Sequence, residues 1–429
     1  MESQKFRPFI FRFFALASLI IAFSSCNKND DTEPDPTERE NQAFYDHMKD
    51  WYYWNNEIPD IDISNYGSIM EVMEAIRYTP LDRWSYITDL DSFLAYMEES
   101  KFVGHGLSFS YDAQGELRVN FVYKTTNLYE SGVRRSWIIR EINGTTITPG
   151  LNISGLLGNN TEGVTNDFVF EDQEGNLVEI NDMKQEIIMN TVLHHEIISL
   201  DDMNIGYIVL QGFTEPTEEE LKTVFSEFAQ QDIDELILDL RYNGGGATSI
   251  ANSLASMIGG DMVQDQTFSK YVFNDVQAEE NNQDEPFNEV ETMLNINRLI
   301  TIATHQTASA SELVINGLKP FLPVTIVGDN THGKPVGMLP FSFQELAIVA
   351  INFRIDNANG EGEYFDGLPV DIPADDDLTR RFGDTEEASL KQALEFIQTG
   401  TVKSASATEI PYQQPYDQLK GLRQVIGAY

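Results

Sequence analysis

Cysteine is nearly absent from this sequence of 429 residues. Cys26 is the only one, so no disulfide can form within the chain. Basic residues are also scarce, because 28 Lys and Arg face 69 Asp and Glu and leave a net charge of −41. A surface this acidic repels phosphate backbones, which excludes a nucleic acid as the expected partner. The apolar run at residues 13–23 is too short for a transmembrane helix, which needs about 20 apolar residues.

The usual signals for metals and cofactors are missing as well. His194 and His195 have no partners at metal-ligand spacing. The run Gly244, Gly245 and Gly246 lacks both the Gly-Lys-Ser/Thr ending of a P-loop and the GxGxxG spacing of a dinucleotide site. We therefore expect neither a metal nor a cofactor.

The first residues have the composition of an export signal. Lys5, Arg7 and Arg12 precede the apolar run, and small residues lead up to Cys26. This arrangement resembles a lipobox, although Phe23 stands where that pattern prefers Leu. We expect residues 1–26 to be a lipoprotein signal peptide and Cys26 to carry the lipid, with ordinary signal cleavage as the alternative.

The next segment, residues 27–40, is acidic and contains proline, which predicts a flexible tether. Acidic residues soon after the lipid-bearing cysteine resemble the surface-export signals of Bacteroidetes lipoproteins. The expected location is the cell envelope, as a membrane-anchored outer-membrane lipoprotein, and this resemblance indicates surface exposure. The inner leaflet and the periplasmic face remain alternatives.

Three regions follow. Residues 41–100 have helical spacing of their aromatic residues, including a helix at 68–78 and a turn with a short extended piece at 81–87. Residues 101–185 contain short alternating runs between Gly, Asn and Asp turns, which predicts a small β-rich module. Residues 188–400 alternate strands and helices, which predicts a mostly parallel sheet covered by helices. The expected strands are 205–210, 236–240, 299–303 and 324–327, and the expected helices are 217–230, 247–258, 309–318 and, last, 385–399. Residues 260–296 are polar enough to suggest a surface excursion, and residues 401–429 form a tail without a strong signal.

The β-rich module resembles a PDZ domain. Gly106, Leu107, Ser108 and Phe109 are similar to the PDZ loop that binds a terminal carboxylate, and residues 131–144 are similar to a later part of that fold. The resemblance implies that backbone N–H groups of this loop hold a peptide end while the peptide adds a strand to the sheet. An unrelated β module without peptide binding is the alternative.

Two segments of the α/β region contain residues suited to catalysis. Ser309 follows an apolar strand and opens a helix, where a side chain is exposed and unpaired N–H groups lie nearby. With Glu312 three residues later, the same pattern is typical of a helix capping box. Lys334 lies in a glycine-rich turn with uncharged neighbours, and a lysine that acts as a base must lose its proton near neutral pH.

These segments together resemble the C-terminal processing (tail-specific) serine peptidases. The resemblance rests on four features: the Ser-Ala-Ser-Glu motif at Ser309, the lysine 25 residues later, the Asp-Leu-Arg-x-Asn-x-Gly-Gly segment at 239–246 and the Gly-Leu-Pro-Val-Asp segment at 367–371. The resemblance implies a ClpP/crotonase-like α/β core with a helical N-terminal region and an inserted PDZ-like domain. It also implies a Ser309–Lys334 dyad, with an oxyanion hole built from the N–H of Ala310 and that of Gly245 or Gly246.

One position departs from the family pattern. The family often has a glutamine four residues after the lysine, and Met338 stands there, while Gln344 is the nearest other candidate. The expected function is a serine endopeptidase acting on protein or peptide substrates, with an oligomeric state that the sequence does not indicate. A catalytically inactive peptide-binding lipoprotein and an esterase remain alternatives. A Ser–His pairing through His305 or His332 is a further one, although neither has an evident orienting carboxylate.

Overall fold

A computed structural model describes residues 35–294, 296–402, 408 and 413–429. The expectations for the signal peptide, for Cys26 and for most of the tether concern residues outside the described part. The end of the expected tether is helical, because α1 (Pro36–Trp51) begins within it. Asp35 accepts a hydrogen bond from the Thr37 N–H, and proline is favourable at the first helical position. The tether prediction is therefore wrong from Pro36 onward.

The N-terminal region packs as a small helical layer against antiparallel strands. Its buried residues, among them Phe44, Met48 and Val72, contact Ile348 and Ile351 from the C-terminal half of the chain. The three-stranded sheet there has the order β1-β19-β18. The elements are α1, η1 (Asn55–Glu57), η2 (Ile63–Asn65), α2 (Ile69–Ile76), β1 (Tyr86–Asp89), α3 (Leu90–Glu99), β18 (Phe341–Phe343) and β19 (Leu346–Val349).

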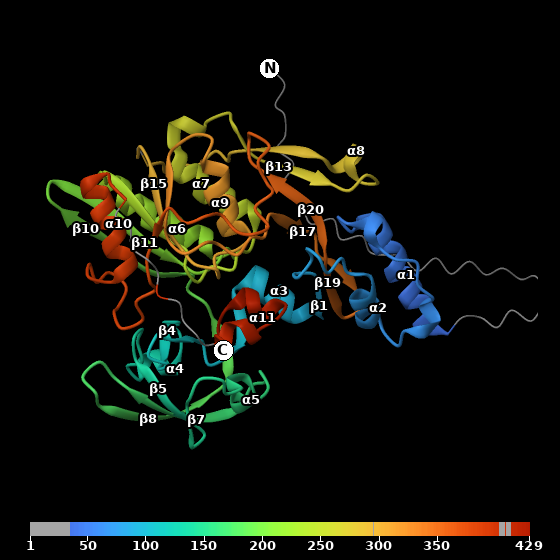
Figure 1. Ribbon diagram of the computed structural model, residues 1–429, viewed down its shortest axis with the longest axis horizontal. Coiled ribbons are helices and arrows are strands. Elements are labelled where there is room, and N and C mark those ends of the chain that lie inside the picture. The colour runs from blue at the N-terminus through green and yellow to red at the C-terminus, as the bar shows by residue number, and fades with distance from the viewer. Residues whose placement is uncertain (1–34, 295, 403–407, 409–412) are drawn as a thin grey trace, which may run out of the picture.

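A six-stranded sheet, at the upper left in Figure 1, has the order β10-β11-β12-β15-β16-β21. The pair β10–β11 is antiparallel and the remaining pairs are parallel. The strands are β10 (Val192–Leu200), β11 (Met203–Leu210), β12 (Glu235–Asp239), β15 (Leu299–Ala303), β16 (Val324–Gly328) and β21 (Ile372–Pro373). The prediction of a parallel sheet covered by helices is confirmed, and all four expected strands are present.

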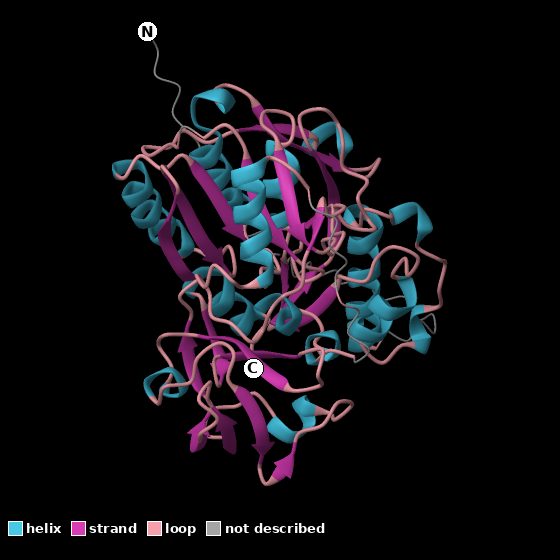
Figure 2. Cartoon of the chain, turned by 60° about the vertical axis from the view of Figure 1, so that its left-hand side comes forward, coloured by secondary structure: helices cyan, strands magenta, loops and turns pink. Residues whose placement is uncertain are grey.

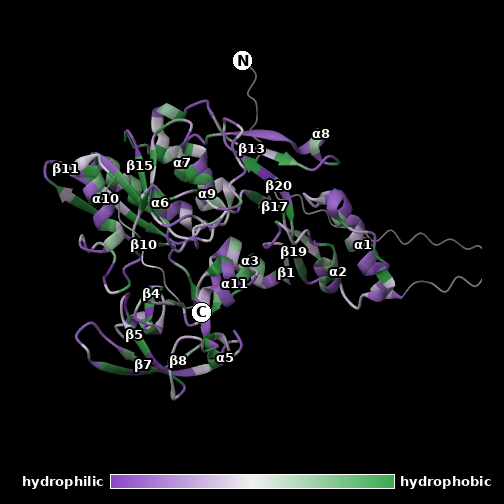
Figure 3. Ribbon diagram, viewed as in Figure 1, coloured by the Kyte–Doolittle hydropathy of each residue, from purple (hydrophilic) through white to green (hydrophobic). Residues whose placement is uncertain are grey.

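Helices cover both faces of this sheet because alternate strand residues point to opposite sides. Leu236 and Leu238 of β12 pack in one core with α6, α7 and α9, whereas Ile237 packs in another with α10. In Figure 3 the strands of this sheet carry many hydrophobic residues, and the helices on it carry both hydrophobic and hydrophilic ones. The helices are α6 (Thr217–Gln230), α7 (Thr248–Gly259), α9 (Ala310–Leu318) and α10 (Ala388–Thr399).

Residues 260–296 are more than the expected surface excursion. Strand β13 pairs with β20, and Phe268 and Phe273 are buried. The polar residues that suggested a surface excursion lie mainly in α8 and β14, which are largely exposed beside β13. The four-stranded sheet has the order β14-β13-β20-β17. The elements are η3 (Gly260–Val263), β13 (Thr267–Phe273), α8 (Ala278–Asn281), β14 (Gln283–Pro286), β17 (Val336–Met338) and β20 (Ile351–Asp356).

The β-rich module is an insertion joined to the rest by a two-stranded ribbon of β2 and β9. It forms the lower part of the molecule in the view of Figure 2. Its sheet has the order β3-β4-β5-β7-β8, with β6 beside β5. The elements are β2 (Lys101–Gly104), β3 (Leu107–Tyr111), β4 (Leu117–Val122), α4 (Asn127–Glu130), β5 (Ile138–Ile142), β6 (Thr145–Thr146), α5 (Ile153–Leu157), β7 (Thr165–Glu171), β8 (Leu177–Met183) and β9 (Gln185–Ile188).

The end of the chain is ordered, contrary to its weak sequence signal. The 3-10 helix η4 (Pro415–Gln418) and the short helix α11 (Leu422–Ile426) follow α10, so the helix at 388–399 is not the last one. Leu422, Ile426 and Ala428 are buried between the module and the core. In the described part of the chain, no helix has the length and apolar character needed to cross a membrane.

Candidate active site

Ser309 sits at a sharp turn between β15 and α9. Its backbone has φ 55° and ψ −116°, a conformation that costs free energy for a residue with a side chain. Ser309 is the N-cap of α9 and its side chain is partly exposed, so the strand-to-helix turn presents it at the protein surface. Strain of this kind persists only where the surroundings impose it.

The buried carboxylate of Glu312 imposes this geometry. Its Oε2 accepts hydrogen bonds from the Ser309 N–H (2.9 Å) and from the Lys334 N–H (2.8 Å). Its Oε1 accepts from the Gly333 N–H (2.7 Å) and from Thr331 Oγ1 (2.5 Å). One oxygen thus ties the backbone of the expected nucleophile to that of the expected base. Burial raises the pKa of Glu312, and these four hydrogen bonds oppose that rise.

Lys334 meets the first requirement of a base. Burial lowers its pKa to about 8, while the charges of Asp82 and Glu312 oppose the shift. Its Nζ donates to Met338 Sδ at 3.7 Å, so the thioether occupies the position where the family often has an amide. Gln344 does not take over that role, because its side chain donates to Glu40 on α1.

His332 has both ring nitrogens engaged. Trp84 Nε1–H donates to His332 Nε2 (3.0 Å), and His332 Nδ1 lies 3.1 Å from the His305 carbonyl oxygen. The ring is therefore neutral with its proton on Nδ1. Burial lowers the pKa of His332 to about 4. These contacts favour a role in holding the loop over a role as the base.

The glycine run lies directly against the serine turn. A Cβ on Gly245 would stand 2.8 Å from Ser309 Cβ and 3.1 Å from the Ala310 nitrogen, so only glycine allows this approach. A Cβ on Gly246 would stand 2.2 Å from the Phe213 carbonyl oxygen. These close approaches hold the glycine run against the Ser309 turn and against Phe213.

The expected oxyanion donors Ala310 and Gly245 differ in whether their N–H groups are already hydrogen-bonded. The Ala310 N–H is buried and has no acceptor among the described residues, which suits it to a developing negative charge. The Gly245 N–H already donates to Asn243 Oδ1 (2.9 Å). Gly245 is therefore not free to donate in this arrangement, and Gly246 is the alternative that the sequence prediction leaves.

Behind the glycine run, a buried ion cluster holds the strand end. Arg241 pairs with Asp239, Asp376 and Glu387, and Arg135 from the β-rich module also donates to Asp376 (2.6 Å). Although burial alone would raise the pKa of Asp376, the charges of Arg135 and Arg241 hold it well below its usual value. The cluster fixes the orientation of the module on the core.

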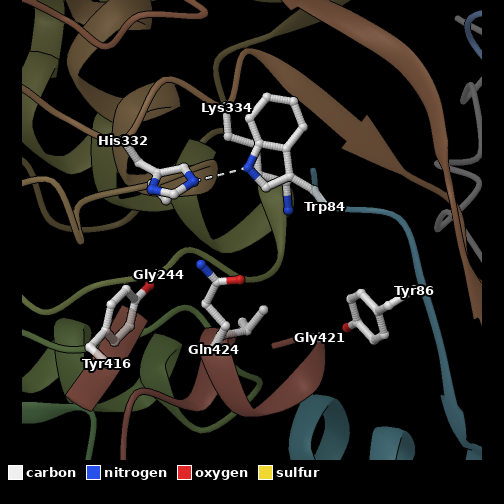
Figure 4. A pocket seen from close by; sticks show the side chains of 10 residues that line it. Trp84, Tyr86, Gly244, His332, Lys334, Tyr416, Gly421 and Gln424 are labelled. Atoms are coloured by element: carbon white, nitrogen blue, oxygen red, sulfur yellow. Dashed lines mark hydrogen bonds between the residues drawn. The ribbon is translucent and has the colours of Figure 1, made fainter. Parts of the chain in front are cut away.

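The cleft beside these residues is narrow. The N-terminal region, the α/β core and the end of the chain meet there. The cavity between them holds about 30 Å³, enough for one or two water molecules. Figure 4 shows Gln424 pointing from α11 toward the space beneath Trp84 and His332. The lining residues are Trp84, Tyr86, Gly244, Ala308, His332, Lys334, Tyr416, Gly421, Gln424 and Val425.

Sequence reasoning missed the contributions of distant segments. Asp82, Trp84 and Tyr86 come from the N-terminal region, and Gln424 and Val425 come from the end of the chain. The motif Asp82-Arg83-Trp84 carries no periodic signal that would have indicated its place. In the described part of the chain, no group of three or more His, Cys, Asp or Glu residues is arranged to hold a metal.

The expected peptide-binding loop begins β3. Gly106 has φ 68°, and the Ser108 Oγ accepts from the buried Asn120 side chain. The N–H and carbonyl of Leu107 pair with the main chain of Tyr429, and the Phe109 ring stacks on the Tyr429 ring. The loop therefore holds residues of its own chain.

Two family models match this chain, one in its N-terminal region and one in its α/β region. The model of peptidase family S41 covers residues 204–373, and that of the peptidase S41 N-terminal domain covers residues 39–86. The first model includes the turns of Ser309 and Lys334.

Curated relatives are processing peptidases. The carboxy-terminal processing protease CtpA of Bacillus subtilis is 20% identical over 371 residues, which is 80% of this chain and 72% of that protein. CtpB of the same species is 26% identical over 35% of this chain, and the chloroplastic C-terminal processing peptidase of Tetradesmus obliquus is 29% identical over 30% of it. These two matches span only 29% and 26% of the relatives' own lengths.

Solved structures share the fold. An S41 protease from Bacteroides fragilis superposes with a TM-score of 0.71 at 23% identity, covering 87% of this chain and all of that one. The photosystem II D1 C-terminal processing protease gives a TM-score of 0.50 at 19% identity, covering 80% of this chain and 94% of that one. The fold and the family models together define a serine-type peptidase. The chain belongs to peptidase family S41.

Proposed function

We propose that the chain is an exported serine endopeptidase that uses Ser309 as nucleophile and Lys334 as general base. The observation that carries the proposal is the Glu312 Oε2 atom, which accepts from the backbone N–H groups of both residues. A lysine whose pKa is lowered to about 8 is unprotonated in about a tenth of molecules at pH 7. This is the fraction that can accept a proton from the serine hydroxyl.

The reaction follows from this arrangement. Lys334 takes the proton of the Ser309 hydroxyl as its Oγ attacks the substrate carbonyl carbon, and the resulting oxyanion accepts from the Ala310 N–H. The lysine then gives the proton to the leaving amine as the peptide C–N bond breaks, which leaves an acyl-enzyme. Water, deprotonated by the same lysine, hydrolyses the ester and restores Ser309.

The β-rich module supplies substrate recognition in this proposal. Its loop from Gly106 to Phe109 presents main-chain groups to a peptide edge, in the manner of a PDZ domain. Lipid attachment at Cys26 would hold the enzyme in the cell envelope, with exported or extracellular proteins as substrates. The alternative of an inactive peptide-binding lipoprotein is favoured by one observation, the thioether contact of Lys334 with Met338.

Labelling and cleavage assays test the dyad. The purified chain from residue 27 onward is treated with a fluorophosphonate probe and, separately, with an unfolded protein substrate. Ser309→Ala should abolish both signals, and Lys334→Ala should reduce cleavage by at least about a hundredfold, the upper part of the range for a general base. Cleavage should survive in His305→Ala and His332→Ala. Loss in the histidine variants with retention in Lys334→Ala would refute the assignment.

A further inference from the structure

Residues 413–429 return from the core to the β-rich module and end beside its first strand. The end of the chain lies at the junction of the module and the core in both views (Figures 1 and 2). Gln211 Nε2 donates to the Ile426 carbonyl (2.8 Å), and Arg423 donates to the Val103 carbonyl (2.6 Å). The segment is therefore held by the core on one side and by the ribbon of the module on the other.

Tyr429, the last residue of the sequence, pairs through its main chain with the first residue of β3. Its N–H donates to the Leu107 carbonyl (2.8 Å), and its main-chain oxygen accepts from the Leu107 N–H (3.2 Å) and the His105 N–H (2.9 Å). Two N–H groups converging on one oxygen, beside a reciprocal strand pair, are the contacts by which a sheet edge captures a peptide. Here the captured residue, Tyr429, belongs to the same chain as the sheet edge.

The side chain of Tyr429 fills an aromatic site. Its ring stacks on Phe109 with centroids 4.5 Å apart, and its hydroxyl donates to the Pro415 carbonyl (3.0 Å). The ring is part of the hydrophobic core of the module and is 6% exposed. Directly before it, Ala428 and Gly427 are buried at the junction of the module and the core, so small residues precede the aromatic one where the segment enters the module.

The same segment covers the catalytic cleft. A Cβ on Gly244 would stand 3.1 Å from the Val425 carbonyl oxygen, and Gln424 and Val425 line the cavity next to Lys334. These residues leave a space of about 30 Å³ beside Lys334. Three residues lie between the cover at Val425 and the anchor at Tyr429, so the anchor and the cover are parts of one short segment.

Resting on the proposed peptidase function, we propose that residues 413–429 are an intramolecular ligand. Tyr429 occupies the module groove that receives a substrate end, and α11 thereby closes the cleft. A polypeptide ending in an aromatic residue preceded by small residues competes for the groove, displaces the segment and opens the site. Substrate selection and activation are then a single binding event.

Peptide binding to an inactive full chain tests this without requiring catalysis. The probe is a fluorescent peptide Val-Ile-Gly-Ala-Tyr, identical to residues 425–429, and the matched peptide ends in Ala. In the Ser309→Ala background, Tyr429→Ala should bind the probe at least about tenfold more tightly, because a tethered competitor acts at millimolar effective concentration. The exposed Lys420→Ala serves as the control on the same segment and should match the parent. Equal affinity in the parent and Tyr429→Ala would overturn the proposal, as would equal binding of the two peptides.

Hydrogen exchange on the wild-type chain provides a second measurement that needs no substitution in the segment. Saturating probe peptide should accelerate amide exchange of residues 413–429 while protection of β3 remains. Binding without that acceleration would overturn the proposal. Cleavage of unfolded protein by the Tyr429→Ala chain with Ser309 intact separates the two ideas. Tighter peptide binding without any cleavage or probe labelling would refute the peptidase function and leave the intramolecular ligand in place.

Discussion

Met338→Gln should raise the pKa of Lys334 and shift the pH–activity profile. The Lys334 Nζ now donates to a thioether at 3.7 Å, and a thioether sulfur is a weak acceptor. A glutamine amide oxygen in the same place would bind the charged ammonium, and hydrogen bonds to charged groups contribute about 1.5–3 kcal/mol. If half of the upper value is realised, the pKa rises by about one unit, because one unit corresponds to about 1.4 kcal/mol.

The assay is kcat/KM for a quenched peptide substrate between pH 6 and pH 10.5. Since the base must be unprotonated, activity should rise with pH, with an inflection near the lysine pKa of about 8 in the wild type. In Met338→Gln the inflection should lie near pH 9, so activity at pH 7 should fall about tenfold and converge with the wild type at the alkaline end.

Met338→Leu is the control, because it keeps the volume and removes the sulfur acceptor. Its inflection should lie at or below that of the wild type. An inflection in Met338→Gln that stays at pH 8 or moves lower would refute the reasoning that the Met338 contact sets the basicity of Lys334.

Three further outcomes are expected. Glu312→Gln should lower the free energy of unfolding by about 2–4 kcal/mol in urea and abolish probe labelling, because an amide cannot accept all four hydrogen bonds of the carboxylate; unchanged stability would contradict this. The depressed pKa of Asp376 contributes stability that is present above its unfolded value of about 3.9 and is lost as pH falls through the folded value. Asp376→Asn should therefore be less stable than the wild type at pH 7 and should lose less stability than the wild type below pH 4. Urea midpoints that fall by the same amount in both proteins as the pH is lowered would disprove this. Cys26→Ser should move the protein from the membrane to the soluble fraction of cells, and unchanged membrane association would exclude lipid attachment.

Local signals predicted the elements that position the site. The strand ending at Ala303, the helix opened at Ser309 and the glycine run at Gly245 are each determined by residues close in sequence, so periodicity and turn chemistry revealed them. The start of α1 was also readable, because Asp35-Pro36 is a helix N-terminal signal within the acidic stretch. Net charge outweighed that signal in the prediction of a tether.

Long-range contacts account for what could not be predicted. Trp84 reaches His332 across 248 residues, and Tyr429 pairs with Leu107 through main-chain atoms that every residue possesses. Main-chain pairing leaves no compositional trace, so the tail had no signal. The double role of Glu312 was hidden for a different reason. Its position three residues after Ser309 fits a helix cap, and only the folded chain brings the Lys334 N–H to the same oxygen.

The ribbon of β2 and β9 makes the β-rich module an exchangeable cassette. Gly104 faces Gln185 at its far end, so the chain leaves and re-enters the core at neighbouring points. A two-residue hairpin turn could close that gap without altering the register of Phe102 against Ile187. A recognition module of other specificity grafted at this covalent junction would also need a partner for Asp376, which Arg135 supplies in the present module.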